Sequence, residues 1–380
     1  MKKIVYIINN AGFFVSHRLP LAEEAIKNNF KVYLITGLPG SAIIDNDAKS
    51  KLSKYEIEHY TVPFSAQGLN PIKETLHLIR IIRILRIIKP DIIHAASPKG
   101  VFLSSLANLF IGSRLQILSI SGMGFLYSSN SKSLFMKIIR LVFKSLIVTA
   151  INIRKTKIIV QNHDDYTDWE KIIFLNHSSI DLIPGSGVDT KIYKDIKYDL
   201  DSNIILFPSR LLIEKGIINF VEASKIISNR GYKWRFVLVG TADYDSPGSV
   251  SMTDLKKWIN LGLVEWMGHQ DDMASVYAAS SIVCLPTYRE GLPKSLLEAS
   301  ASGIPVITTN AVGSKEAIVE NHTGLLVPVD DSRKLADSIQ LLIDNPDLRV
   351  KFGENGKKHA EEKFSIRKVK KSFLDLYLDT

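Results

Sequence analysis

The sequence predicts an α/β protein made of two similar halves, each built around a parallel β-sheet. Three observations lead to this prediction. Short runs rich in Ile and Val recur without polar alternation, as they do in buried parallel strands. Helical stretches separate these runs, which is the βαβ pattern. The pattern occurs twice within 380 residues, a length that suits two or three domains.

The expected elements follow this pattern from end to end. In the first half we expect strands at 3–8, 32–36, 59–62, 91–95, 115–120 and 157–161, with helices between them such as 20–28 and 72–89. In the second half we expect strands at 204–207, 236–239, 264–267, 282–285, 306–308 and 325–328. Helices are expected there at 217–228, 254–261, 273–278, 295–302, 314–319 and 332–344.

The boundary between the halves is predicted near Ile183-Pro184-Gly185-Ser186-Gly187-Val188-Asp189. Two glycines and a proline after a strand suit a hinge, although a simple surface turn would use the same residues. This divides the chain into an N-terminal domain, 1–183, and a C-terminal domain, 184–365. An amphipathic helix in 366–380 completes the chain and could return to the first domain.

Composition and charge restrict the class of protein. With 23% charged and 46% hydrophobic residues, the chain is neither disordered, collagen-like nor a coiled coil. One cysteine, Cys284, excludes an internal disulfide framework and a multi-cysteine metal site. Residues 1–180 carry 23 Lys and Arg against 12 Asp and Glu, a balance of +11, whereas 181–380 carry 25 against 27, a balance of −2. A basic half can face nucleic acid, anionic lipid or an anionic substrate.

Two glutamates follow the predicted strand at 282–285. Glu290 is expected in the loop before a helix, and Glu298 one to two turns into that helix among apolar residues. A partly buried carboxylate needs a partner, which a ligand with several hydroxyl groups would supply. The alternative is that Glu290 complements the helix dipole and Glu298 is solvated.

A second polar group follows the predicted strand at 204–207. Arg210 and Lys215, with the backbone amides near Gly216, suit a diphosphate, because Arg binds phosphate bidentately and Lys adds a point charge. The alternative is two surface cations, one of them paired with Glu214.

Together these residues resemble the signature of the retaining nucleotide-sugar glycosyltransferases of family 4. The resemblance rests on Arg210 with Lys215-Gly216, and on Glu290 and Glu298 with seven residues between them. Gly187-Val188-Asp189 resembles the domain crossing of this family, and Asn9-Asn10-Ala11-Gly12 its first glycine-containing loop. The resemblance implies the GT-B fold, two Rossmann-like domains facing across a cleft.

The same resemblance implies the donor site. Arg210 and Lys215 would bind the donor diphosphate and stabilise charge on the leaving group, and Glu290 would contact the transferred sugar. Glu298 would hold the ribose hydroxyls. The donor site would be completed by Gly12, Gly291 and the backbone amide of Leu292. It implies no metal and no cofactor apart from the nucleotide-sugar co-substrate.

On the acceptor side the sequence departs from the family, because 119–125 lacks the histidine that many members carry. Ser121 and the backbone of Gly122 and Gly124 would line the acceptor pocket instead. A subset of the family, similar to the bacillosaminyl-lipid N-acetylgalactosaminyltransferases, resembles this chain in three segments, namely 119–125, 14–20 and 183–189. That subset implies a UDP-linked N-acetylhexosamine as donor and a polyprenyl-diphosphate-linked saccharide as acceptor, at the cytoplasmic face of the inner membrane.

Further acceptor-side candidates are His17, Arg18 and Lys99. His17 and Arg18 would contact acceptor or donor phosphate, or else form a pair on a helix surface. Lys99 follows the fourth strand, where α/β sheets bind ligands, and could face the acceptor pyrophosphate. His94 lies inside that strand and is interpreted as a core histidine with satisfied hydrogen bonds.

Two basic stretches could lie at a membrane surface. Residues 76–89 are interpreted as a crossover helix with its cations in water. In 134–144, Lys137, Arg140 and Lys144 alternate with bulky apolar residues, including Leu134, Phe135 and Phe143, and predict contact with an anionic membrane. The sequence contains no basic platform with interleaved aromatic residues, so it does not predict nucleic-acid binding.

Two other functions remain open at the level of the sequence. One is a nucleotide-sugar 2-epimerase on the same fold, which would need no acceptor. The other is a non-catalytic partner subunit that binds the donor without turning it over.

Overall fold

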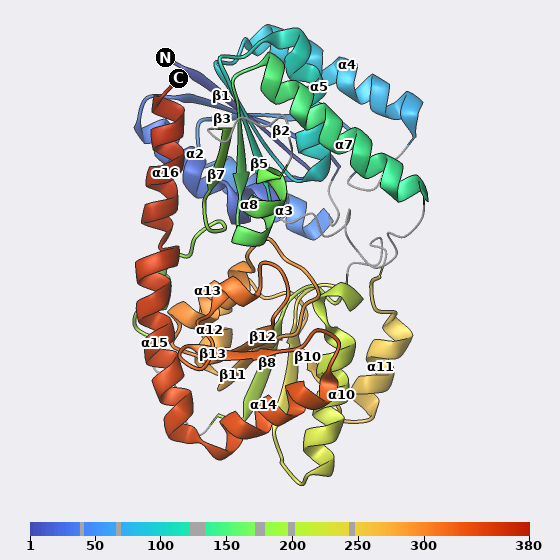
Figure 1. The fold of residues 1–380 in the computed structure, drawn as a ribbon, viewed down its shortest axis with the longest axis vertical. Helices are drawn as coiled ribbons and strands as arrows, with labels where there is room; N and C mark the ends of the chain where they lie inside the picture. The colour runs from blue at the N-terminus through green and yellow to red at the C-terminus, as the bar shows by residue number, and fades with distance from the viewer. Residues whose placement is uncertain (39–41, 66–69, 122–133, 172–178, 197–201, 243–247) are drawn as a thin grey trace. The chain divides into compact units, whose positions relative to one another are not determined.

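The computed structural model describes residues 1–38, 42–65, 70–121, 134–171, 179–196, 202–242 and 248–380. These residues form two compact units (Figure 1). Unit 1 comprises Met1–Ser186 and Val369–Thr380, and unit 2 comprises Gly187–Lys368. Each unit contains one parallel sheet, which confirms the predicted α/β class. The division falls inside the segment predicted as a hinge.

The sheet of unit 1 has the strand order β3-β2-β1-β4-β5-β6-β7, and its pairings are parallel. Neighbouring residues of β1 point to opposite faces: Val5 and Ile7 enter one hydrophobic core, and Ile4 and Tyr6 enter the other. The short strand β7 was missing from the predicted set. The strands are β1 (Lys3–Ile8), β2 (Lys31–Thr36), β3 (Ile57–Thr61), β4 (Ile92–Ala96), β5 (Leu115–Ile120), β6 (Thr156–Val160) and β7 (Ile180–Leu182).

Helices cover both faces of this sheet. The core on one face includes buried residues of α4, α5 and α7, and the core on the other face includes residues of α2, α3 and α16. Asn10 caps α1, and Asn70 caps α4. The helices of unit 1 are α1 (Ala11–His17), α2 (Leu19–Lys27), α3 (Ala42–Leu52), α4 (Pro71–Ile88), α5 (Pro98–Ile111), α7 (Leu134–Ile153), α8 (His163–Glu170) and α16 (Ile366–Leu378).

The last helix, α16, is anchored in unit 1 by a buried polar network. The Tyr377 hydroxyl lies 2.9 Å from the Tyr6 hydroxyl and 2.7 Å from His94 Nδ1. The other ring nitrogen of His94, Nε2, lies 2.8 Å from Ser119 Oγ. Both nitrogens of His94 are therefore satisfied, which confirms its interpretation as a core histidine.

Unit 2 repeats the architecture with the strand order β10-β9-β8-β11-β12-β13. The predicted helix at 314–319 is wrong, because only a short 3-10 turn forms and Ile318 is already extended. The strands are β8 (Ile204–Pro208), β9 (Arg235–Val239), β10 (Glu265–Trp266), β11 (Ile282–Leu285), β12 (Val306–Thr309) and β13 (Gly324–Val327). The helices and 3-10 turns are α9 (Thr190–Tyr193), η3 (Ile213–Lys215), α10 (Ile217–Asn229), α11 (Met252–Asn260), α12 (Met273–Ala278), α13 (Lys294–Ala301), η4 (Lys315–Ala317), α14 (Ser332–Asp344) and α15 (Pro346–Phe364).

In both sheets the strand order reverses at the first strand. In unit 1 this point lies between β1 and β4, and in unit 2 it lies between β8 and β11. Open α/β sheets bind ligands outside the carboxyl ends of the strands at such a reversal. The topology therefore directs attention to the loops after these four strands.

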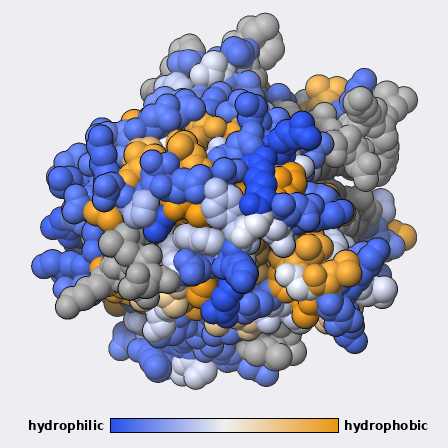
Figure 2. Space-filling view, turned by 90° about the horizontal axis from the view of Figure 1, so that it is seen from below, coloured by the Kyte–Doolittle hydropathy of each residue, from blue (hydrophilic) through white to orange (hydrophobic). Residues whose placement is uncertain are grey.

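Hydrophilic residues predominate on the face of the molecule that Figure 2 shows, and the hydrophobic residues there form separate patches. Among the helices of the described residues, none combines the length and the apolar composition needed to cross a bilayer.

Candidate active site

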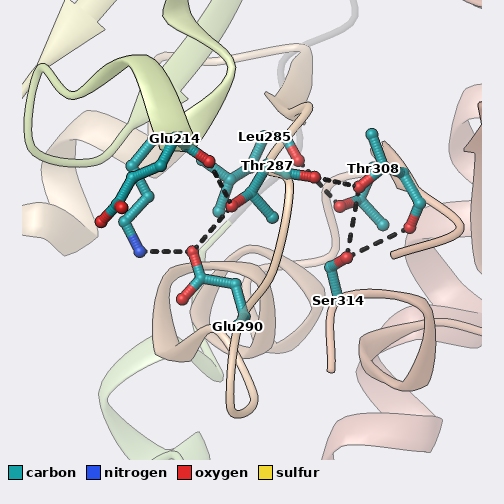
Figure 3. Close-up of polar contacts among 8 residues, drawn as sticks. Glu214, Leu285, Thr287, Glu290, Thr308 and Ser314 are labelled. Atoms are coloured by element: carbon teal, nitrogen blue, oxygen red, sulfur yellow. Dashed lines mark hydrogen bonds and ion pairs between the residues drawn. The ribbon is translucent and has the colours of Figure 1, made fainter. Parts of the chain in front are cut away.

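The centre of the site in unit 2 is an ion pair between two of the predicted residues. Lys215 lies in η3, after β8, and Glu290 lies in the loop after β11. The Lys215 ammonium contacts Glu290 Oε1, and the two side chains are 15% and 14% exposed (Figure 3). The strand reversal of unit 2 thus brings together residues that are 75 positions apart in the sequence.

Gly216 fixes the position of Lys215. Its φ is +79°, in the left-handed region that favours glycine. A Cβ atom at this position would lie 1.9 Å from the carbonyl oxygen of Pro286. The loop after β8 can therefore approach the end of β11 only with glycine here, and this approach places Lys215 beside Glu290.

Glu290 is held by Thr287 and by the loop after β12. The Thr287 hydroxyl lies 3.1 Å from Glu290 Oε1 and 3.1 Å from the carbonyl oxygen of Glu214 (Figure 3). The Glu290 amide donates to the carbonyl oxygen of Val312 over 3.0 Å. Gly313 permits this approach, because a Cβ there would lie 2.3 Å from the Glu290 carbonyl oxygen.

A group of buried hydroxyls forms hydrogen bonds that support the same loops. Thr308 Oγ1 donates to the carbonyl oxygen of Leu285 over 2.8 Å, and Thr309 Oγ1 donates to that of Thr287. Ser314 Oγ lies 3.3 Å from Thr309 Oγ1 (Figure 3). These bonds tie the end of β12 to the end of β11, so the support of Glu290 is rigid. The sequence prediction missed Thr287, Gly313 and these hydroxyls, although their positions at the ends of strands or in the loops after them were a usable signal.

Glu298 lies in α13 and has partners within this chain. Its Oε1 lies 3.3 Å from Lys294 Nζ, and its Oε2 lies 3.3 Å from the Tyr277 hydroxyl, which also lies 2.9 Å from the carbonyl oxygen of Ser295. Burial, followed by the charge of Glu298, raises the pKa of Tyr277, so this hydroxyl stays protonated as a donor. The alternative interpretation of a solvated Glu298 is wrong, because the carboxylate is largely buried and held from two sides.

The remaining predicted donor residues lie in the same loops. Arg210 comes two residues after the end of β8 and has an exposed side chain. Gly291 and the Leu292 side chain are buried, so Leu292 can reach a ligand only through its backbone. Lys215 therefore lies just before the N-terminus of α10, which favours anions, and contacts the Glu290 carboxylate, while Arg210 lies in the same loop after β8.

Unit 1 buries Arg18 rather than presenting it. Its side chain is 1% exposed, and Nη1 donates to the carbonyl oxygen of His17 over 3.0 Å and to Ser186 Oγ over 3.3 Å. The guanidinium lies 5.9 Å from the ring centroid of Phe373 in α16. Burial lowers the pKa of Arg18. Arg18 therefore packs on a neighbouring element, as in the alternative interpretation, but it is buried rather than on the helix surface. His17 is half-buried and stacks on Phe13.

The other candidates of unit 1 follow β1, β4 and β5. Gly12 lies in the first turn of α1, because Asn10 caps that helix, and its role in donor binding stays a prediction. Lys99, at the start of α5, pairs with Glu74 of α4 at 2.8 Å. Ser121 follows β5 and is half-buried, while Gly122 and Gly124 lie outside the described residues.

Comparison with known families covers most of both units. Residues 188–359 match the family described as glycosyl transferases group 1, and residues 3–162 match the family described as glycosyl transferase 4-like. The chain belongs to the group 1 glycosyltransferases. The matched segments contain the residues at the ends of β8 and β11 as well as those after β1 and β4.

Relatives match this glycosyltransferase over almost its whole length. It is 25% identical over 377 residues to the capsular polysaccharide biosynthesis glycosyltransferase CapM of Staphylococcus aureus, covering 96% of this chain and 94% of the relative. It is 23% identical to the N,N'-diacetylbacillosaminyl-diphospho-undecaprenol alpha-1,3-N-acetylgalactosaminyltransferase of Campylobacter jejuni, covering 97% of each.

A solved structure shows the fold of this glycosyltransferase. Anabaena Alr3699/HepE, solved in complex with UDP and glucose, matches with a TM-score of 0.77 and 17% identity, covering 100% of both chains. This likeness confirms the predicted GT-B fold.

Proposed function

We propose that this glycosyltransferase moves a UDP-linked N-acetylhexosamine onto a polyprenyl-diphosphate-linked saccharide, with retention of the anomeric configuration. The observation that carries the proposal is the Lys215–Glu290 pair at the strand reversal of unit 2, with Arg210 in the adjacent loop. The Campylobacter relative, named for an undecaprenol-linked acceptor, and the UDP-bound Anabaena structure support the two substrate classes. The pathway would be bacterial surface polysaccharide or glycoprotein glycan assembly.

The contacts in unit 2 suggest how the donor is bound. Lys215 turns from Glu290 to the diphosphate, which carries more negative charge than one carboxylate. This exchange frees Glu290 Oε1 to accept a hydrogen bond from a sugar hydroxyl, while Thr287 keeps the carboxylate in place. Arg210 and Lys215 then stabilise the charge that develops on the leaving diphosphate.

Glu298 binds the ribose in this proposal. The Tyr277 hydroxyl and the Lys294 ammonium orient its carboxylate without neutralising all of its acceptor capacity, because a carboxylate has about four lone-pair positions. Two ribose hydroxyls can use the remaining positions.

We propose that transfer needs no metal ion, because the cations of unit 2 supply the charge. Within the described ranges, no group of three His, Cys, Asp or Glu side chains is placed to hold a metal. The chain contains three Asp-x-Asp sequences, at 45–47, 199–201 and 243–245. Asp45 and Asp47 pair with Lys49 and Lys51 at 2.7 Å each, and the other two sequences lie outside the described residues.

A donor panel distinguishes this function from its alternatives. Purified protein is incubated with UDP- and GDP-sugars, with and without polyprenyl-diphosphate saccharides, and the products are identified by mass and by sugar analysis. Transfer to the lipid-linked acceptor supports the proposal. An acceptor-independent change of the sugar in the nucleotide-sugar indicates a 2-epimerase, and donor binding without turnover indicates a non-catalytic partner.

We further propose that unit 1 binds an anionic membrane peripherally, at the cytoplasmic face of the inner membrane. Residues 60–160 carry 14 Lys and Arg against Glu74 and Asp91, a balance of +12. In α7, Ile138, Leu141 and Val142 are 51%, 66% and 52% exposed, next to the exposed Lys137. Exposed apolar residues beside cations suit an interfacial helix.

The structure changes the predicted membrane surface in α7 and in α4. Phe143 packs in the core of unit 1 and cannot insert into lipid, while the side chains of Leu134, Phe135 and Arg140 lie outside the described residues. Helix α4 does pack Ile81, Leu85 and Ile88 on the sheet, as a crossover helix should. Its outer face nevertheless exposes apolar residues, namely Ile72, Leu76, Ile79 and Ile87.

Vesicle sedimentation tests this placement. Wild type should bind anionic vesicles, and Ile138→Ser/Leu141→Ser/Val142→Ser and Lys137→Glu/Lys144→Glu should each lose most of the binding, since each nearby cation contributes about 1 kcal/mol. Leu261→Ser, at an exposed residue of unit 2, is the control. Equal binding by all variants, or none by wild type, would refute the membrane placement.

A further inference from the structure

Three side chains that the donor site does not use gather at the carboxyl edge of the unit 1 sheet. Glu74 and His77 belong to the first two turns of α4, and Lys99 opens α5 directly after β4. This edge lies at the strand reversal between β1 and β4, the position at which open α/β sheets bind ligands.

Glu74 is the centre of this cluster. Its Oε1 lies 2.8 Å from Lys99 Nζ, and its Oε2 lies 3.8 Å from His77 Nδ1. The side chains of Lys99, His77 and Glu74 are only 10%, 12% and 17% exposed. The His77 ring packs near Phe64, with the ring centroids 6.5 Å apart. The cluster is thus built into the unit rather than lying loose on its surface.

Two buried polar atoms of the cluster lack a hydrogen-bond partner within the part of the chain that the structure describes. Glu74 Oε2 and His77 Nδ1 are enclosed, and neither has a hydrogen-bond partner among the described residues. At 3.8 Å they are too far apart to bond to one another. Buried polar atoms without partners are costly and rare, so two of them facing each other indicate a missing group.

One hydroxyl group satisfies both atoms. An oxygen about 2.8 Å from each can donate its proton to the carboxylate and accept one from the imidazole. A small rotation of the Glu74 carboxylate about its last bond, which is a soft torsion, would open Oε2 to a ligand. The ligand class that offers hydroxyls to such a pair is a saccharide.

We propose that Glu74 and His77 bind a hydroxyl group of the acceptor saccharide, and that Lys99 is a positioning residue that orients Glu74. This inference rests on the proposed function, which supplies a saccharide acceptor. It also revises the expected role of Lys99, because its contact with Glu74 offsets the charge that a pyrophosphate would need.

A purely structural role explains only part of the geometry. A carboxylate in the first turn of α4 is favourable to the helix dipole, and its contact with Lys99 ties α4 to α5. Neither effect needs His77, and neither accounts for the open Oε2 atom. A test must therefore measure a property that helix stability would not change.

The first measurement is steady-state kinetics of Glu74→Gln and His77→Phe with synthetic polyprenyl-diphosphate N-acetylglucosamine and N-acetylgalactosamine as acceptors. Each variant should raise the acceptor KM about tenfold, the effect of losing a hydrogen bond to a charged group. Affinity for UDP and the rate of donor hydrolysis in water should not change. Glu56→Gln, at an exposed glutamate of unit 1, is the matched control and should behave as wild type.

The second measurement uses acceptors that each lack one hydroxyl. For wild type, removal of the bound hydroxyl should lower kcat/KM about tenfold or more, and this loss should shrink to about threefold or less in Glu74→Gln/His77→Phe. The proposal is overturned if wild type transfers sugar but every deoxy acceptor penalises the double variant as strongly as wild type. Wild type that uses none of the parent acceptors overturns the proposed function and this subsite with it.

Discussion

At the level of single residues, the proposed function depends on two cations and two carboxylates of unit 2. Lys215 and Glu290 neutralise one another in the absence of donor, so neither charge is left unpaired in a partly buried site. The pair keeps both side chains oriented toward the position that the diphosphate and the sugar would occupy.

Removing either cation should slow transfer strongly. Lys215→Ala and Arg210→Ala should each reduce kcat by about 10²- to 10³-fold, because each removes a preorganised charge at the developing anion. Lys225→Ala, at an exposed lysine of α10, should leave kcat unchanged. Steady-state rates with saturating donor measure the effect, and circular dichroism verifies folding. Activity of both variants within threefold of wild type would rule out the diphosphate role.

Variants of Glu290 and Glu298 should affect different steps of the reaction. Glu298→Gln should weaken UDP binding, because Glu298 is assigned to the ribose, whereas Glu290→Gln should mainly lower kcat. Calorimetric titration with UDP alone measures the first effect, which should be about tenfold for a charged hydrogen bond. An unchanged UDP affinity in Glu298→Gln would contradict the ribose assignment.

At the scale of elements, the glycines after the strands decide how closely the loops approach. Gly216 and Gly262 both have positive φ, +79° and +68°, but only Gly216 faces another backbone. Around Gly262 a Cβ atom would meet nothing within 4 Å. The two positions therefore form a matched pair that separates backbone strain from close approach.

Gly216→Ala should be much more harmful than Gly262→Ala. Gly262→Ala should cost about 1–2 kcal/mol of stability from the left-handed conformation alone and keep UDP affinity. Gly216→Ala should cost more and also weaken UDP binding, because Pro286 or Lys215 must move. Urea unfolding and UDP titration of both variants measure this. Equal effects on both properties would show that the approach of the loops is unimportant.

The buried network under α16 should make stability depend on pH. Burial, followed by the positive charge of Arg18, holds the pKa of His94 well below 6.5, so the folded protein keeps His94 neutral. Below pH 6.5 the unfolded chain binds a proton that the folded chain does not, and stability falls as pH falls, by up to about 1.4 kcal/mol per pH unit. In His94→Asn, urea midpoints measured between pH 7.5 and 5 should fall less steeply. Parallel curves for both proteins would contradict this.

Strands and helices could be predicted from the sequence where a local pattern of apolar residues determines them. Runs such as 282–285 reappear as β11 with the same bounds, because a continuous apolar stretch between polar loops has few other solutions. Prediction failed where the outcome depends on distant residues. The segment 314–319 has helical composition, yet it forms only η4, since the chain beyond it is already extended. The three-residue strand β7 is too short to carry a pattern.

The residues of the candidate site likewise differ in whether the local sequence could predict them. Arg210, Lys215, Glu290 and Glu298 could be chosen from their spacing, but their partners could not. Thr287 and Gly313 hold Glu290 through contacts that join separate loops, and Tyr277 reaches Glu298 from another helix. Likewise, nothing in the local sequence indicates that Arg18 is covered by Phe373 of α16, which is 355 positions away.

At the scale of the whole molecule, each unit carries its own group of polar residues at the reversal of its sheet. Unit 2 holds cations and carboxylates suited to a nucleotide-sugar, and unit 1 holds the Glu74 cluster suited to a saccharide hydroxyl. In the proposed function, donor and acceptor are therefore recognised by separate units. It also predicts that variants of unit 1 change the acceptor KM and variants of unit 2 change UDP affinity.

The proposed function requires metal-free transfer with retention at the Arg210, Lys215 and Glu290 site. The most direct test is proton NMR of the product formed from a UDP-α-N-acetylhexosamine and a polyprenyl-diphosphate saccharide in the presence of EDTA. We expect a new α-glycosidic bond, formed at the same rate with and without EDTA. A β-glycosidic bond, or transfer that stops in EDTA and returns with magnesium or manganese, would contradict it.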